Sequence, residues 1–200
     1  MQPPDAAGRC VAGSERCDGE ERGRTTAENM LNAGIRWCNY TIWEKGHADS
    51  RFKNMGTTVV AIHFDDEFST MAHVGDSRVY RIRQGKLEQL TEDHSLVNEK
   101  IRAGLLTPEQ AKNHKHKNII TRSLGYTEDV EIDVQVKAVR RGDRFLLCSD
   151  GLSNLVDPAD MGEAARSMTP QEGARHLIQH ACERGGDDNI TCVLARVDEL

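Results

Sequence analysis

Aromatic residues are scarce in this chain, since Phe, Trp and Tyr make up 4% of its 200 residues. Proline is also rare, with five residues, and no stretch approaches the roughly 18 consecutive apolar residues of a membrane-spanning helix. The N-terminal region has no apolar run between a basic start and a small-residue cleavage site, so no secretory signal is predicted. We therefore expect a cytoplasmic protein that has no membrane partner.

Basic residues are outnumbered: 26 Lys and Arg stand against 32 Asp and Glu, which gives a net charge of -6. Nucleic-acid binding across a whole protein needs a basic face that replaces phosphate counterions, so we expect no nucleic-acid partner. Hydrophobic residues at 38% and charged residues at 29% lie near the globular average, and 200 residues suffice for one sizeable core. The composition therefore predicts one folded domain.

Cysteines are few and widely spaced, and none of the six forms a Cys-x-x-Cys pair, so reduced thiols are expected rather than disulfides. Cys10 and Arg16 have the spacing of a phosphate-binding nucleophile loop, but such a loop needs a buried strand before it and a helix after it. No strand pattern occurs there. We therefore expect residues 1–25 to be a leader, either disordered or a non-native start, and the domain to span residues 26–200.

Short segments rich in Val, Ile, Thr, Phe and Tyr alternate with turn signals after residue 56. They predict strands at residues 57–64, 68–74, 78–83, 86–90, 130–138, 144–149 and 190–197. Helices are predicted at about residues 25–48 and 95–112. Thr107-Pro108 and Thr169-Pro170 each place a capping Thr before a proline at the first helical position, so helices are predicted to start there, the second of them long. Strands in hairpins with grouped helices indicate an α+β fold of one or two antiparallel sheets covered by helices.

Three aspartates lie at predicted strand ends beside small or turn-forming residues: Asp76, Asp150 and Asp188. A carboxylate in such a place can project into a cleft while the backbone turns away, as a site for a hard divalent ion requires. Any one of them alone is most often part of a turn. Their shared context makes the three together candidate metal ligands.

Six motifs accompany these aspartates in order along the chain: GTT at 56–58, VGDSR at 74–78, LTEDHS at 90–95, TRSLG at 121–125, LCSDGL at 147–152 and DNIT at 188–191. On these motifs the chain resembles the PPM-type, or 2C-class, metal-dependent serine/threonine protein phosphatases in their bacterial form. The resemblance covers about residues 26–197. It implies a sandwich of two antiparallel β-sheets flanked by helices.

The resemblance also implies a hydrolase function. Two Mn²⁺ or Mg²⁺ ions, and in some arrangements a third, would hold a water that attacks phosphoserine or phosphothreonine without a covalent enzyme intermediate. Asp150 and Asp188 match the family's ligands for the second metal, and Asp76 matches a ligand of a further, weaker ion shared with Asp150. Carboxylates suit such ions, whereas thiolates select softer metals, so Cys148 is expected in the core. The implied partners are phosphorylated proteins, the substrates of Ser/Thr kinases, in cytoplasmic signalling.

Residues 94–122 match the flap beside the family's active site, and they carry six Lys and Arg against two Glu. A basic flap would steer an acidic phosphopeptide towards the site; a solvated basic turn is the equal alternative. His94, His114, His116 and Arg122 are therefore candidate substrate-binding residues. His114 and His116 are not predicted to bind metal, because their cationic neighbours repel it.

The beginning of the chain departs from the family pattern. Family members carry there a phosphate-binding Arg, a metal-site acid and an Asp-Gly-x-Gly-Gly-His stretch, whereas Asp18 is followed by Gly-Glu-Glu-Arg-Gly. We do not assign Asp18, and we expect the N-terminal strands of the sandwich to be missing. Two functions stay open: an active protein phosphatase, and an inactive phosphatase-like module that binds phosphoproteins.

Overall fold

The computed structural model describes residues 25–112 and 114–199. Its helices are α1 (Thr26–Ala48), the 3-10 helix η1 (Ser50–Phe52), α2 (Leu96–Arg102), α3 (Pro108–Lys112), α4 (Asp150–Ser153), α5 (Pro158–Ser167) and α6 (Pro170–Glu183). Its strands are β1 (Val59–Phe64), β2 (Phe68–Val74), β3 (Arg78–Arg83), β4 (Lys86–Gln89), β5 (Asp133–Ala138), β6 (Arg144–Cys148) and β7 (Cys192–Arg196). The expected leader lies outside the described residues apart from Thr25, whose side chain caps α1.

Two antiparallel sheets form the centre of the domain. One has the strand order β1-β2-β5 and the other β4-β3-β6-β7. Side chains from both sheets share a buried cluster, in which Met71 of β2, Val79 of β3 and Phe145 of β6 are at most 3% exposed. Because alternate residues of each strand point into the space between the sheets, this cluster is the inner core of the predicted sandwich.

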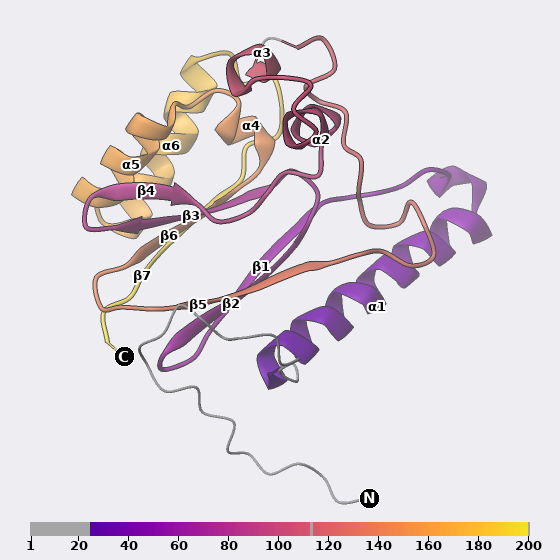
Figure 1. The fold of residues 1–200 in the computed structure, drawn as a ribbon, viewed down its shortest axis with the longest axis horizontal. Helices are drawn as coiled ribbons and strands as arrows, with labels where there is room; N and C mark the ends of the chain where they lie inside the picture. The colour runs from indigo at the N-terminus through magenta and orange to yellow at the C-terminus, as the bar shows by residue number, and fades with distance from the viewer. Residues whose placement is uncertain (1–24, 113, 200) are drawn as a thin grey trace, which may run out of the picture.

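Helices cover the outer faces of both sheets (Figure 1). α1 packs against the three-stranded sheet, where Ile35 joins a cluster with buried residues of β2. α5 and α6 pack against the four-stranded sheet. Along α6, Leu177 and Ala181 are buried while Arg175 and Gln179 point away from the core, as the helical spacing predicts. Among the described residues, no helix combines the length and the apolar character that a membrane span needs.

Most predicted elements are present, and the differences lie between them. The predicted helical interval at 95–112 is two short helices, α2 and α3, with Gly104 in a left-handed conformation between them. α3 starts at Pro108, as the Thr107-Pro108 signal predicts. α4 and α5 were not predicted, although Asp157-Pro158 offers the same cap-and-proline signal that marks the start of α6. Residues 130–132 precede β5 without joining its ladder.

Asn39 connects α1 to the loop before β5 and is 1% exposed. Its side-chain amide donates to the carbonyls of Thr127 and Glu128, and its oxygen accepts the backbone N–H of Gly125 at 2.8 Å. Asn39→Ala would leave the buried N–H of Gly125 without a partner and would remove two hydrogen bonds to the exposed residues Thr127 and Glu128, so we expect a loss of about 2–3 kcal/mol in the free energy of unfolding. Urea denaturation tests this, with Gln171→Ala on the solvent side of α6 as the control that should change stability by less than about 0.5 kcal/mol. An Asn39→Ala loss as small as the control's would contradict it.

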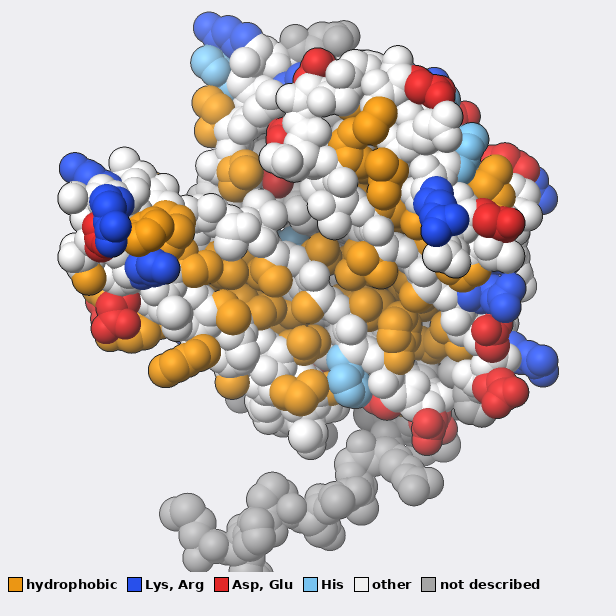
Figure 2. All heavy atoms as spheres, turned by 180° about the vertical axis from the view of Figure 1, so that it is seen from behind, with side chains coloured by type: hydrophobic (Ala, Val, Ile, Leu, Met, Phe, Trp, Pro, Cys, Tyr) orange, Lys and Arg blue, Asp and Glu red, His pale blue; other side chains and the backbone are white. Residues whose placement is uncertain are grey.

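A band of apolar side chains crosses the face opposite to that of Figure 1 (Figure 2). Large apolar residues exposed among those described include Trp37 on α1, Phe64 on β1 and Val193 on β7. β1 and β7 are each at the edge of their sheet, so one side of each backbone lacks a strand partner within the described sheets.

Candidate metal centre

The strand register brings the three candidate aspartates to one end of the four-stranded sheet. The first residue of β3 lies opposite the last residue of β6, which lies opposite the first residue of β7. Asp76 comes just before β3, Asp150 just after β6 and Asp188 just before β7. Because these strands are neighbours, the three carboxylates belong to the same edge of the sandwich.

The carboxylates influence one another's ionisation. Burial, followed by the charge of Asp150, raises the pKa of Asp76 from 3.8 to about 6. Burial, followed by the charge of Asp188, raises the pKa of Asp150. Like charges held close together disfavour ionisation, and a divalent cation bound between them removes this repulsion. The row of three oxygen donors therefore fits hard divalent ions.

Close packing of two loops places Asp188 beside Asp150. The Ser149 hydroxyl donates to the carbonyl of Asn189 at 2.9 Å and accepts the N–H of Thr191 at 3.0 Å. Gly151 permits this approach, since a Cβ there would lie 2.5 Å from the carbonyl oxygen of Asn189. The Ser-Asp-Gly and Asp-Asn-Ile-Thr motifs are therefore two halves of one local structure.

A cleft of about 550 Å³ extends from Asp76 and Asp150 to the flap, which contributes Lys117 to its lining. Arg78 also lines the cleft, but its guanidinium donates to both carboxylate oxygens of Asp93, at 2.9 and 2.6 Å. Its charge is therefore already compensated. Arg78 orders the wall of the cleft and is not a free phosphate ligand.

Two of the four candidate substrate-binding residues lie at the base of the flap. His94 is 8% exposed, and its Nδ1 accepts the backbone N–H of Gly75 at 3.0 Å. Arg122 donates to Asp133 at 2.6 Å and to Glu131 at 3.1 Å. Both side chains are engaged within the domain, so their geometry suits holding the flap in place better than contacting a substrate.

The other two candidates, His114 and His116, lie in the flap beyond α3. The backbone N–H of His116 donates to Nδ1 of His114 at 3.1 Å, and the two rings are 5.6 Å apart. Burial, followed by the charges of Lys100, His116 and Lys115, lowers the pKa of His114. Within the part of the chain that the structure describes, neither histidine belongs to a group of three possible metal ligands.

One group of three possible ligands does occur among the described residues: His73, His94 and Asp133, whose ligand atoms lie within 4.8 Å of one another. The two rings are stacked with planes 18° apart, so one ion cannot lie in both ring planes as imidazole ligation requires. The Arg122 guanidinium also lies 3.0 Å from His94 and 2.6 Å from Asp133. This group is therefore an ion-pair cluster.

Sequence reasoning missed His73 and Asp133. They are far apart in the chain, and no spacing marks them. The antiparallel register of β2 with β5 places them opposite each other. Asp18, which we left unassigned, lies outside the described residues.

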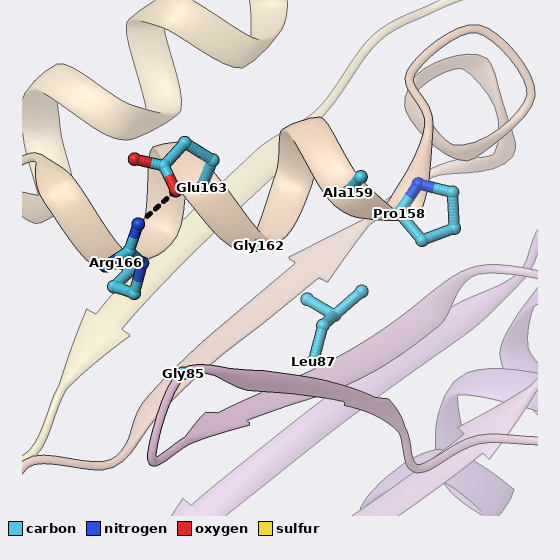
Figure 3. Close-up of a pocket in the computed structure, with 7 residues that line it drawn as sticks. All are labelled: Gly85, Leu87, Pro158, Ala159, Gly162, Glu163 and Arg166. Carbon is cyan, nitrogen blue, oxygen red and sulfur yellow. Dashed lines mark hydrogen bonds and ion pairs between the residues drawn. The ribbon is translucent and has the colours of Figure 1, made fainter.

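A second hollow of about 360 Å³ lies between the β3–β4 turn and α5 (Figure 3). Leu87, Pro158, Ala159 and two glycines line it, together with an ion pair between Glu163 and Arg166. Its one basic group is already paired with an acid, and none of the three aspartates lines it. The candidate metal centre is therefore in the cleft beside Asp76 and Asp150, and not in this second hollow.

Comparison with known proteins agrees with this geometry. The family model described as Protein phosphatase 2C matches residues 6–194, which begins within the expected leader. The serine/threonine phosphatase stp of Listeria monocytogenes is 41% identical over 172 residues, covering 86% of this chain and 68% of the relative.

Solved structures show the same fold. The serine/threonine phosphatase PstP/Ppp of Mycobacterium tuberculosis superposes with a TM-score of 0.83 at 37% identity, covering 91% of this chain and 76% of the other. A structure of the PstP catalytic domain in complex with two manganese ions gives a TM-score of 0.79 at 37% identity, covering 91% and 75%. The sandwich, the ordered motifs and these relatives lead to one conclusion: the chain belongs to the PPM-type serine/threonine protein phosphatases, hydrolases that dephosphorylate proteins.

Proposed function

We propose that Asp76, Asp150 and Asp188 hold the divalent cations of this phosphatase, Mn²⁺ or Mg²⁺. Asp150 and Asp188 take one ion together, and Asp76 with Asp150 takes a further, weaker one. The observation that carries this proposal is the register of β3, β6 and β7, which brings the three carboxylates to one end of the sheet. Burial and the charge of a neighbouring carboxylate raise the pKa of Asp76 and of Asp150, which agrees with this placement. When bound, such ions activate a water and offset charge on the phosphoryl oxygens.

The remaining residues of the cleft shape and hold this centre. Ser149 and Gly151 fix Asp150 against the loop that carries Asp188. The Arg78–Asp93 pair closes one wall while leaving little net charge there. The three acids thus add negative charge at this end of the sheet, and bound divalent ions would offset that charge for an entering phosphate group.

The flap supplies the positive charge for the substrate. Arg122 is compensated by Asp133 and Glu131, and Arg102 lies 3.7 Å from Glu92. Lys115 and Lys117 are exposed, and Lys117 lines the cleft that leads to Asp76. We therefore assign the steering of an acidic phosphopeptide to these two lysines, with Ser/Thr kinase substrates in cytoplasmic signalling as the phosphoproteins.

Metal dependence tests this function. Chelator-treated protein should gain phosphothreonine-peptide hydrolysis when Mn²⁺ or Mg²⁺ is added, and its unfolding temperature should rise, because the ions bind the folded state and remove carboxylate repulsion. Ca²⁺ is a useful comparison, since it also prefers oxygen ligands but tolerates other geometries. Hydrolysis that persists in excess chelator, together with an unfolding temperature indifferent to all three ions, would contradict the proposal.

A further inference from the structure

His94 ties the flap to the end of β2. Its backbone N–H donates to the carbonyl of Gly75 at 3.0 Å, and its Nδ1 accepts the N–H of Gly75 at 3.0 Å. Its own carbonyl accepts the N–H of Thr121, in the segment where the chain returns from the flap, at 2.8 Å. One residue therefore links both ends of the flap to Gly75, which directly precedes Asp76.

The hydrogen bonds around His94 determine where its proton lies. Because Nδ1 accepts from Gly75, a neutral ring carries its hydrogen on Nε2. Nε2 lies 3.3 Å from one carboxylate oxygen of Asp133, while Arg122 donates to the other at 2.6 Å. The N–H of Gly75 thus sets the tautomer, and Asp133 is the acceptor that faces the hydrogen on Nε2, although Nη1 of Arg122 also lies 3.0 Å from that nitrogen.

The surroundings keep this ring neutral. Burial, followed by His73 and Arg122, lowers the pKa of His94, and Asp133 opposes them. His73 stacks on the ring with centroids 4.6 Å apart and contacts the carbonyl of Glu92 through its Nε2. A second proton on His94 would have to sit on Nδ1, pointing at the N–H of Gly75.

Gly75 has little freedom to move independently. Its φ is +111°, and a Cβ at this position would lie 2.3 Å from the Cγ2 atom of Thr58. A displacement of the His94 ring is therefore passed through a short, tightly packed segment to the backbone of Asp76.

We propose that His94 is a positioning residue: through Gly75 it sets the position of the Asp76 carboxylate and couples the flap to the metal centre. This inference rests on the proposed function, because it takes Asp76 as a metal ligand. In this role His94 acts through Gly75 and needs no contact with an ion or the substrate. Partners that orient metal ligands typically contribute about 10–100-fold to metal affinity, which is the size of effect expected here.

Three substitutions separate this role from simple filling of space. In His94→Asn, the amide oxygen can replace Nδ1 as the acceptor for Gly75, whereas in His94→Gln the amide lies near the place of Nε2. Mn²⁺ binding, measured by the loss of the free-ion paramagnetic resonance signal, should be weakened about 10–100-fold in His94→Gln and His94→Ala. His94→Asn should bind Mn²⁺ close to wild type. His180→Asn, on α6 and 3.3 Å from Asp160, is the matched control.

A spectroscopic measurement covers the case in which a variant folds poorly. In wild type, the ring nitrogen shifts of His94 should report a neutral ring with hydrogen on Nε2 at pH 7. The amide proton of Gly75 should move upfield in His94→Gln but not in His94→Asn, because only the first loses its acceptor. The opposite tautomer, or a charged ring, would overturn the proposal.

The two possible failures are distinguishable. Wild-type Mn²⁺ binding with equal affinities for the Asn, Gln and Ala variants would reject the role of His94 and leave the metal centre intact. Absence of Mn²⁺ binding by the wild type would reject the proposed function and this inference together.

Discussion

Asp150→Asn is expected to abolish Mn²⁺-dependent hydrolysis of a phosphothreonine peptide, with a fall of at least about 100-fold in kcat/KM, or roughly 2.7 kcal/mol of transition-state stabilisation. Asp150 is the central member of the row, coupled to Asp76 on one side and to Asp188 on the other. An amide keeps the size of the side chain but supplies no negative charge for either ion. Steady-state kinetics across a range of Mn²⁺ concentrations measure the loss.

A matched surface variant shows whether the loss is specific. Asp160→Asn removes a carboxylate from α5 that lies 3.3 Å from both His180 and Arg184, and it should retain activity. Equal losses in the two variants, or activity in Asp150→Asn that a chelator does not affect, would reject the assignment of Asp150.

Asp150→Asn should also stabilise the metal-free protein at neutral pH. The folded pKa of Asp76 is raised, so its ionisation opposes folding, and metal-free stability attributable to this group falls as pH rises from about 4 through 6. Burial is the largest cause of this raised pKa, and Asp150→Asn leaves it in place; partial exposure also screens the charge of Asp150, so the expected gain is at most about 1 kcal/mol. The gain should be larger at pH 8 than at pH 5, which chemical denaturation in chelator can measure.

Gly75→Ala is expected to cost about 3–5 kcal/mol in the free energy of unfolding, because overpacking typically costs about 1–3 kcal/mol and so does a strained backbone conformation. A Cβ would lie 2.3 Å from Cγ2 and 2.6 Å from Cβ of Thr58, and the backbone φ of +111° is strained for any residue with a side chain. Urea denaturation of the metal-free protein measures the sum of the overpacking cost and the backbone-strain cost.

Gly142→Ala separates the two contributions. Gly142 also has a positive φ, of +87°, but nothing lies within 4 Å of the position that an added Cβ would take, so only the backbone cost of about 1 kcal/mol should appear. Thr58→Ala combined with Gly75→Ala should recover part of the packing loss, because it removes the nearer of the two contacting atoms. A Gly75→Ala loss no larger than that of Gly142→Ala would show that the segment before Asp76 is not tightly packed.

Local sequence signals were sufficient for most of the regular structure. Alternating apolar residues and hairpin turns predicted all seven strands of the described sheets, and the Thr-Pro signal predicted the start of α6. α5 shows the limit of this approach, since its Asp157-Pro158 start was present but did not stand out between a strand and a longer helix. α4 has four residues, too few for any periodic pattern.

The candidate site was only partly accessible from the sequence. Asp76, Asp150 and Asp188 could be singled out because each sits beside Gly, Ser or Asn at a strand end, and the ordered motifs indicated the family. The assignment of His94 and Arg122 to the flap was made from the same motifs. Their direction, inward to Gly75 and Asp133, could not be predicted, because the partners come from other strands.

The amino-acid sequence by itself was sufficient to predict the family, the two-sheet architecture and the three candidate aspartates. Periodicity, turn-forming residues and short motifs are local signals, which can be read from a few neighbouring positions. Strand register decided everything that depends on contact between distant segments. It brought three carboxylates to one end of the sheet, where the charge of Asp150 raises the pKa of Asp76 and the charge of Asp188 raises that of Asp150. It also paired Arg78 with Asp93, and set His73 opposite Asp133 to form the cluster that holds the flap. Such contacts depend on strand register and on packing across the sandwich, which bring together side chains that are far apart in the sequence.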